Sequence, residues 1–249
     1  MTSAATAALA KVRQGLDELG WIDAGEPRYL AEQSGRFEYL LNYLQETTAP
    51  GARVLDVGSH ALHFAIAARG LGFDVAGADV DYFVTHPEVR KRQARFGIPD
   101  IREYDLPNAR VPFDDAGFDV VNFAESIEHL NFNPLPAITE FRRLLKPGGR
   151  LIVTTPNAVR LGARVKFLMG RNVFADLDTL CRGDAYSVHF REYTMDELCT
   201  LLEWGGFSIA RRECRYLYPV SGVERALKAV VRAVAPHLGG NLIVVGQNK

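Results

Sequence analysis

Apolar residues along this chain form short continuous runs that alternate with longer segments of helical spacing. The runs typical of buried strands are 54–57, 73–78, 118–123, 150–155 and 242–246. Between them, apolar residues recur every three or four positions, as on the buried face of a helix, in 36–45, 62–69, 136–145 and 194–204. This alternation predicts an α/β fold with a mostly parallel sheet and helices on both faces.

Two regions stand apart from this alternation. A weak helix, a loop around residues 25–27 and the helix at 36–45 predict an N-terminal helical cap over residues 1–50. Residues 157–187 show little periodicity and are too long for an ordinary connection, so they predict a lid or substrate-binding insertion. Both regions are expected to belong to one domain that covers residues 1–249. A basic amphipathic helix at 223–235 is expected to cover the sheet, with contact to a membrane surface as the alternative.

The stretch 53–81 has the features of a nucleotide-binding βαβ unit. Its first strand ends at Gly58, and Asp79 follows 21 residues later, at the tip of the next predicted strand. A glycine lets the backbone approach a ligand closely, and a carboxylate at that distance can accept hydrogen bonds from a ribose. Only the first glycine of the G-x-G-x-x-G pattern is present, which argues against a pyrophosphate-containing dinucleotide. S-adenosylmethionine carries no phosphate and fits one glycine preceded by Asp56.

Composition narrows the class of partner. The formal net charge is −1, so no overall field favours nucleic acid or an anionic membrane. Three cysteines without metal-ligand spacing suit a reducing compartment. No apolar run is long enough to span a bilayer, and the first residues lack the pattern of a signal peptide. These features predict a cytoplasmic protein without a membrane span.

Five motifs in register resemble the class I S-adenosylmethionine-dependent methyltransferases. They are VLDVGS (54–59), GADVD (77–81), VPFDDAGFDVV (111–121), ESIEHL (125–130) and LLKPGGRLIVTTPN (144–157). The resemblance implies a Rossmann-like, seven-stranded, mostly parallel sheet with an antiparallel final hairpin. It also implies that Gly58 contacts the methionine part of the cofactor, Asp79 the ribose, and Asp105, near the end of a strand predicted at 101–106, the adenine. Asp56, Ser59 and Val80 belong to the same motifs and are further candidates for cofactor binding.

Glu125, Glu128 and His129 form the strongest candidate for a chemical site. In helical geometry they stand at i, i+3 and i+4 and point the same way, while His189 lies 60 residues further along the chain. Two carboxylates close together repel unless a cation lies between them, so this set suggests metal ligands.

The E-x-x-E-H pattern resembles two groups of metal-dependent O-methyltransferases, the ubiquinone-pathway catechol enzymes and the small-RNA 2′-O-methyltransferases. Likeness to the first group implies metal ligation by Glu125, Glu128, His129 and His189, and cofactor contacts by Arg36 and Ala124. Mixed oxygen and imidazole ligands suit Mn²⁺, Fe²⁺, Co²⁺ or Zn²⁺ better than Mg²⁺, but availability favours Mg²⁺, so Mg²⁺ or Mn²⁺ is the expected ion. His60 stands where a second glycine is common in the family, and both His60 and His63 are interpreted as structural.

The expected reaction is S-adenosylmethionine-dependent O-methylation of a vicinal diol or catechol in a small molecule or glycan. A metal would lower the pKa of the acceptor hydroxyl, with His129 or His189 taking the proton and Glu128 holding the ion. Residues 157–187 would then select the acceptor. The alternatives are a metal-independent methyltransferase with His129 as base, and a catalytically silent cofactor-binding relative. Neutral net charge counts against a nucleic-acid acceptor.

Overall fold

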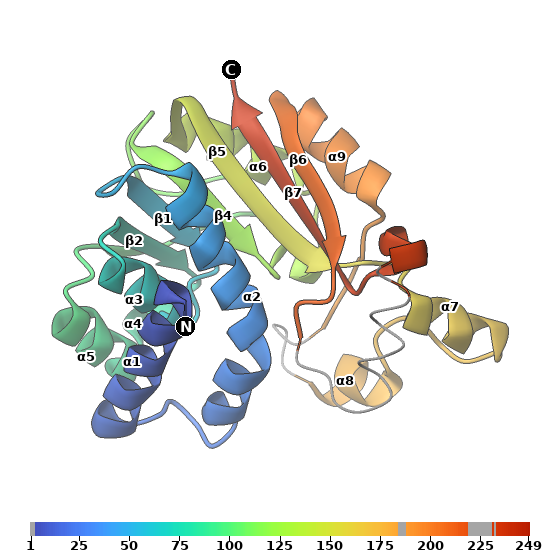
Figure 1. Cartoon of the computed structure of the whole chain (residues 1–249), viewed down its shortest axis with the longest axis horizontal. Coiled ribbons are helices and arrows are strands. Elements are labelled where there is room, and N and C mark those ends of the chain that lie inside the picture. Colours follow the sequence, from blue (N-terminus) through green and yellow to red (C-terminus); the bar gives the residue numbers. More distant parts are fainter. Residues whose placement is uncertain (1–2, 184–187, 219–230, 232) are drawn as a thin grey trace.

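A computed structural model describes residues 3–183, 188–218, 231 and 233–249, and a seven-stranded sheet forms its centre (Figure 1). The strand order is β3-β2-β1-β4-β5-β7-β6. The strands are β1 (Arg53–Val57), β2 (Asp74–Asp79), β3 (Ile101–Glu103), β4 (Phe118–Ala124), β5 (Leu145–Pro156), β6 (Phe207–Arg215) and β7 (Asn241–Asn248). The predicted Rossmann-like α/β fold is confirmed.

The direction of the strands fixes where a ligand can bind. Strands β3, β2, β1, β4 and β5 pair in parallel, and β7 runs antiparallel to both of its neighbours, β5 and β6. The strand order reverses at β1, because β2 lies on one side of it and β4 on the other. In sheets of this kind the crevice at the carboxyl ends of the strands next to such a reversal is the ligand site.

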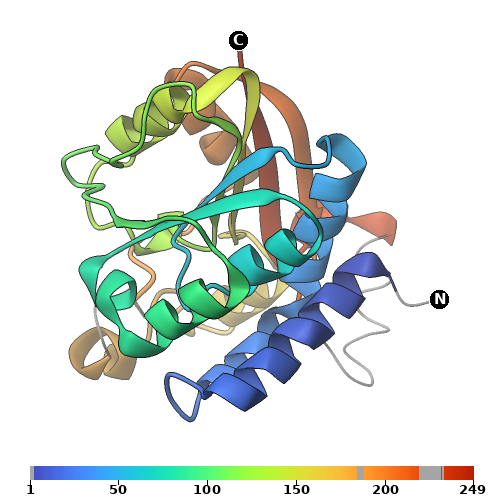
Figure 2. The same ribbon diagram turned by 90° about the vertical axis from the view of Figure 1, so that its left-hand side faces the viewer.

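Helices cover both faces of the sheet and divide its core into two layers. One apolar cluster joins α1 (Ala4–Leu19), α2 (Glu26–Thr47), α3 (His63–Gly70) and α5 (Pro87–Phe96) to alternate strand residues such as Val54 and Val120. The other joins α6 (Leu135–Leu144) and α9 (Met195–Trp204) to the intervening strand residues. Figure 2 shows α1 running alongside α2 on the first face. The remaining elements are α4 (Asp81–Thr85), η1 (Ile127–His129), α7 (Leu161–Leu168), α8 (Leu177–Arg182) and η2 (Pro236–Leu238).

Helix α2 begins ten residues earlier than the sequence pattern predicts. The loop expected around residues 25–27 is the first turn of the helix, where Pro27 needs no hydrogen-bonded N–H. Gly35 does not interrupt the helix because it lies against the chain near Leu217. A Cβ on Gly35 would lie 2.2 Å from the Leu217 carbonyl oxygen, so close packing requires a glycine there.

A buried ion cluster holds the N-terminal helices against the rest of the domain. The Arg92 guanidinium, from α5, donates hydrogen bonds to both carboxylate oxygens of Glu26, at 2.5 and 2.9 Å. His63, the first residue of α3, lies 2.7 Å from the same carboxylate, and all three side chains are buried. Burial alone would raise the pKa of Glu26, but the hydrogen bonds from His63 and Arg92 outweigh it and hold the pKa at about 2. His63 is therefore structural, as expected.

Other boundaries also differ from the sequence expectation. Strand β3 ends at Glu103, so it is shorter than the strand predicted at 101–106. A strand is also predicted from the sequence over 207–218, and β6 ends earlier, at Arg215. The described part of 157–187 contains two short helices, α7 and α8. Most of the helix expected at 223–235 lies outside the described residues. Among the described helices, none combines the length and apolar character needed to cross a bilayer.

Candidate active site

A cavity of about 1700 Å³ opens at the carboxyl edge of the sheet. The ends of β1, β2 and β4 form its floor, and residues of α2 and of the α7–α8 segment form its walls. Most residues that the sequence singles out line it. The exceptions are Val80, whose backbone supports Asp79, and Asp105.

The turn after β1 brings backbone directly to the cavity. Gly58 has φ +75°, a conformation that L side chains rarely adopt, and a Cβ there would lie 2.4 Å from the Ser126 hydroxyl. Its N–H and that of Ser59 both donate to the Ala78 carbonyl, which ties the turn to β2. The Ser126 hydroxyl fills the place that a side chain would take, so a glycine is required at this point of the cavity wall.

His60, at the position where the resemblance leads one to expect a second glycine, adopts the left-handed conformation, with φ 47°. Its ring packs on Tyr29 at 4.9 Å and Phe83 at 4.5 Å between centroids. Burial lowers the pKa of His60 to about 3, so the ring stays neutral at physiological pH. His60 thus has a packing role, as expected, but it also forms part of the cavity wall.

Asp79 stands at the tip of β2, where the nucleotide-binding spacing places it. Its carboxylate accepts the backbone N–H groups of His60 and Val80. Burial nevertheless raises its pKa to about 6, because these two bonds do not replace full hydration. The carboxylate lines the cavity and is held rigidly by two backbone donors.

Asp56 lies beneath the turn and is buried. Its carboxylate accepts a hydrogen bond of 2.7 Å from the Asn122 side-chain amide on β4. Burial raises the pKa of Asp56 to about 7 despite this bond and the nearby Arg36. The fold therefore holds a carboxyl group that resists ionisation.

The raised pKa of Asp56 makes stability depend on pH. In the unfolded chain the group ionises near 3.8, and in the folded protein only near 7, so the folded state binds the extra proton between these values. Stability from this group is full below pH 4 and is lost as the pH rises through 7. Asp56→Asn should raise the free energy of unfolding at pH 8 by about 2–4 kcal/mol and change it little at pH 4. Urea titrations at the two pH values measure this, and an equal effect at both would contradict it.

Asp105 does not reach the cavity, contrary to the adenine contact implied for it. Its side chain is exposed and caps its own turn by accepting from the backbone N–H and the side-chain amide of Asn108. The reason is that β3 ends at Glu103, after which the chain turns to form the Asp105–Arg110 bridge. Tyr104 lines the cavity instead.

Arg36, on α2, places a buried guanidinium beside the end of β4. It donates to the Ala124 carbonyl at 3.3 Å and to the Tyr29 hydroxyl at 3.2 Å. Its Nε has no hydrogen-bond partner among the described residues. A buried cation with an unused donor at a cavity wall is suited to an anionic group of a ligand.

Glu125 does not stand in helical geometry with Glu128 and His129. It precedes the single turn η1 and has φ 49°, so the three residues do not follow one another along a helix. Its carboxylate accepts from the Tyr218 hydroxyl at 2.6 Å and from the Asn241 amide at 3.3 Å. The helical arrangement expected for this motif is therefore wrong, because the chain leaves β4 through a sharp turn rather than entering a helix.

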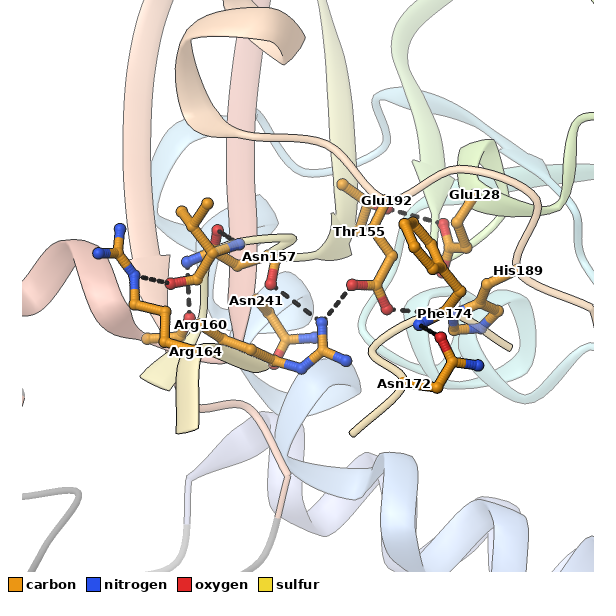
Figure 3. A network of polar contacts seen from close by, with 12 residues as sticks. Glu128, Thr155, Asn157, Arg160, Arg164, Asn172, Phe174, His189, Glu192 and Asn241 are labelled. Atoms are coloured by element: carbon orange, nitrogen blue, oxygen red, sulfur yellow. Dashed lines mark hydrogen bonds and ion pairs between the residues drawn. The ribbon is translucent and has the colours of Figure 1, made fainter. Parts of the chain in front are cut away.

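Glu128, His129 and His189 come together as the sequence predicts. One ligand atom from each lies within 4.8 Å of the other two, and the two imidazole rings meet edge to face at 4.7 Å between centroids. Figure 3 shows Glu128 and His189 in the polar network that lines this end of the cavity. Among the described residues, this is the one group of His, Cys, Asp and Glu with such spacing.

Neighbouring groups orient each member of this cluster. The Thr155 hydroxyl donates to Glu128 at 2.9 Å, and Nδ1 of His129 donates to the Val188 carbonyl at 3.0 Å, so Nε2 is the acceptor nitrogen of that ring. Nδ1 of His189 lies 3.6 Å from Glu192, which also pairs with Arg160 (Figure 3).

Burial raises the pKa of Glu128 well above its usual value, and the charge of Glu125 adds to this. A buried carboxyl group that ionises reluctantly next to two imidazoles is a donor set that a divalent cation fits, because the cation would supply the missing positive charge.

Several residues that shape the site carry no recognisable motif in the sequence. They are Tyr29, Asn122, Arg160, Glu192, Tyr218 and Asn241. They come from separate elements and meet only in the folded chain, so spacing along the sequence gives no indication of them.

A mostly parallel sheet with a cavity at the Gly58 turn and the tip of β2 is the arrangement of class I methyltransferases. The family described as methyltransferase domain matches residues 29–229, and the chain belongs to this family.

Two curated relatives agree with this. A probable S-adenosylmethionine-dependent methyltransferase of Mycolicibacterium smegmatis is 33% identical over 159 residues, covering 64% of this chain and 53% of the relative. A demethylmenaquinone methyltransferase of Renibacterium salmoninarum is 32% identical over 104 residues, covering 42% of this chain and 41% of the relative. The matches thus span about half the length of these relatives.

Solved structures share the fold at low sequence identity. The complex of the Haloferax volcanii Trm112 methyltransferase activator with a putative methyltransferase matches with a TM-score of 0.61 and 15% identity, covering 100% of this chain and 98% of that chain. A [4+2]-cyclase matches with a TM-score of 0.58 and 20% identity, covering 86% and 81%. The fold therefore supports more than one chemistry, and the function has to be argued from the site.

Proposed function

We propose that this protein transfers the methyl group of S-adenosylmethionine to a hydroxyl oxygen of a small molecule or glycan, assisted by a divalent cation. The observation that carries the proposal is one cavity with two ends. One end has the glycine turn, Asp79 and Arg36, and the other has the cluster of Glu128, His129 and His189.

The first end suits the cofactor. Gly58 admits the methionine part, and Asp79 accepts hydrogen bonds from the ribose hydroxyls. Arg36, buried and with an unused Nε donor, holds the methionine carboxylate. The sulfonium cofactor supplies an electrophilic methyl group, and these residues fix the direction in which that group points.

The second end suits the acceptor. A Mg²⁺ or Mn²⁺ ion held by Glu128, His129 and His189 would lower the pKa of an acceptor hydroxyl. Glu192 and the Val188 carbonyl keep the two imidazoles in place. The acceptor oxygen forms a bond to the methyl carbon, the carbon–sulfur bond breaks, and the hydroxyl proton leaves to solvent, because a histidine bound to the ion through its acceptor nitrogen has no free lone pair. A vicinal diol or catechol presents two adjacent oxygens to this cluster.

The test separates cofactor binding from metal-assisted transfer. Calorimetry with S-adenosylmethionine should show binding, and transfer of a labelled methyl group should be found in a panel of catechols, vicinal diols and sugars supplied with Mn²⁺ or Mg²⁺. Binding that persists in EDTA while transfer stops supports the proposal. Full transfer in EDTA would favour a metal-independent reaction with His129 as base, and absence of binding would favour a silent relative.

Replacing Arg36 should weaken cofactor binding selectively. Arg36→Gln removes the charge opposite the methionine carboxylate, so the affinity for S-adenosylmethionine should fall about ten- to 100-fold. Arg28→Gln is the matched control, because Arg28 lies on the same helix and pairs with Glu32 on the exposed surface. Calorimetry on both variants measures the difference, and equal affinities would show that Arg36 has no role in binding.

A further inference from the structure

The segment 161–182 exposes an unusual amount of apolar surface. Seven of the eleven exposed large apolar side chains in the described part of the chain lie within it, namely Val165, Phe167, Leu168, Met169, Phe174, Leu177 and Leu180. Phe167 is 72% exposed, Leu168 85% and Phe174 83%. Apolar side chains scattered singly over a surface need no explanation, but a cluster of this size marks an interaction site.

The two helices of this segment have almost no packing of their own. Helix α7 buries Ala163 alone, and α8 buries no residue. Helices this short are marginal in water, and most of their stability in proteins comes from burying one face. Figure 1 shows α7 and α8 projecting beyond the carboxyl edge of the sheet. A surface that covers them would supply the missing burial.

Charge indicates which kind of surface this is. The segment carries the basic residues Arg164, Lys166, Arg171 and Arg182 and the acidic residues Asp176 and Asp178, a net charge of +2 in a chain whose formal charge is −1. The low overall charge therefore hides a local excess of cations. Basic side chains interspersed with exposed phenylalanine and leucine are typical of segments that lie in the interface of an anionic bilayer.

We propose that residues 161–182 dock on an anionic lipid surface, with Phe167, Leu168 and Phe174 entering the boundary between headgroups and acyl chains. The basic side chains then contact the lipid phosphates. Val165, Lys166 and Phe174 also line the cavity, so docking places its mouth against the bilayer. On the proposed function, it follows that the acceptor is an amphiphile whose hydroxylated head group enters from the membrane.

Vesicle sedimentation with the full chain tests docking. The protein should sediment with vesicles of phosphatidylcholine and phosphatidylglycerol, less with pure phosphatidylcholine, and less at high salt. The triple variant Phe167→Ser, Leu168→Ser, Phe174→Ser should bind the anionic vesicles at least about tenfold more weakly. Arg164→Gln and Arg171→Gln should each weaken binding by roughly fivefold. Trp204→Ser is the control, because Trp204 is 71% exposed on α9, outside the segment, and should not change binding.

The other outcomes overturn the proposal. Light scattering that shows the chain dimerising, with the triple variant monomeric, would identify a second copy as the occupant. Equal binding of the wild type and the triple variant would show that the lipid contact lies outside residues 161–182. No vesicle binding by either would show that the chain does not dock on lipid. Calorimetry with S-adenosylmethionine is run in parallel. Cofactor binding without vesicle binding refutes docking alone, whereas vesicle binding without cofactor binding refutes the proposed function alone.

Discussion

Glu128→Gln is expected to lower kcat by about 100-fold or more and to leave the affinity for S-adenosylmethionine unchanged. Glu128 is the one carboxylate in the cluster with His129 and His189, and an amide is a far weaker ligand for a divalent cation. The fold should tolerate the change, because burial raises the pKa of this carboxyl group and so disfavours its charge, which an amide does not carry. Thr155 can still donate to the amide oxygen. Metal titration and labelled-methyl assays measure the loss.

Glu125→Gln is the matched control for this prediction. The E-x-x-E-H pattern gives both glutamates the same role, but in the folded protein the Glu125 carboxylate pairs with Tyr218 and Asn241. Metal affinity should therefore change by no more than about threefold in this variant. Equal losses of metal affinity in the two variants would show that Glu125 completes the metal site after all.

Arg92→Met should destabilise the protein by about 3–5 kcal/mol, the range measured when one partner of a buried ion pair is removed. Arg92 also donates to the carbonyls of Ala61 and Gly20, so its loss leaves these two oxygens and both carboxylate oxygens of Glu26 with fewer partners. The chain should unfold at a lower urea concentration, with α1 and α2 released from α5. Cofactor affinity should fall as well, because Glu26 and His63 form part of the cavity wall.

Arg28→Met provides the comparison for stability. Arg28 and Glu32 form an exposed pair on α2, and such pairs contribute less than about 1 kcal/mol. The loss in free energy of unfolding, measured by urea denaturation, should therefore be several-fold larger for Arg92→Met than for Arg28→Met. Losses of similar size in the two variants would mean that the buried pair of Arg92 and Glu26 contributes no more to stability than an exposed pair.

The sheet and the cofactor end of the site were largely predictable. Continuous apolar runs place β1, β2, β4, β5 and β7 because strands buried on both faces need apolar residues on both. Gly58 and Asp79 follow from spacing, since the geometry of a βαβ unit brings a turn and a strand tip together from local sequence alone. The start of α2 was not predictable, because Gly35 disfavours a helix locally and only close packing on the chain near Leu217 makes it suitable.

The chemical end of the site was predictable only in part. Glu128 and His129 are neighbours in the chain, and His189 was inferred from residue type. The sequence could not show that the Glu125 carboxylate pairs with Tyr218 and Asn241, because that depends on one left-handed residue and on partners 93 and 116 positions away. The position of Asp105 outside the cavity was not predictable for a related reason. Its carboxylate accepts a hydrogen bond from Asn108 in its own turn and does not line the cavity.

The amino-acid sequence by itself determined the alternation of strands and helices, the glycine turn and the acidic strand tip, because each depends on interactions between residues close together in the chain. Only the tertiary structure decided which side chains share the cavity, which carboxylate joins the two histidines, and that the apolar residues of 161–182 stay exposed. Those outcomes depend on contacts between distant segments, and a pattern of residue types along the chain does not record them.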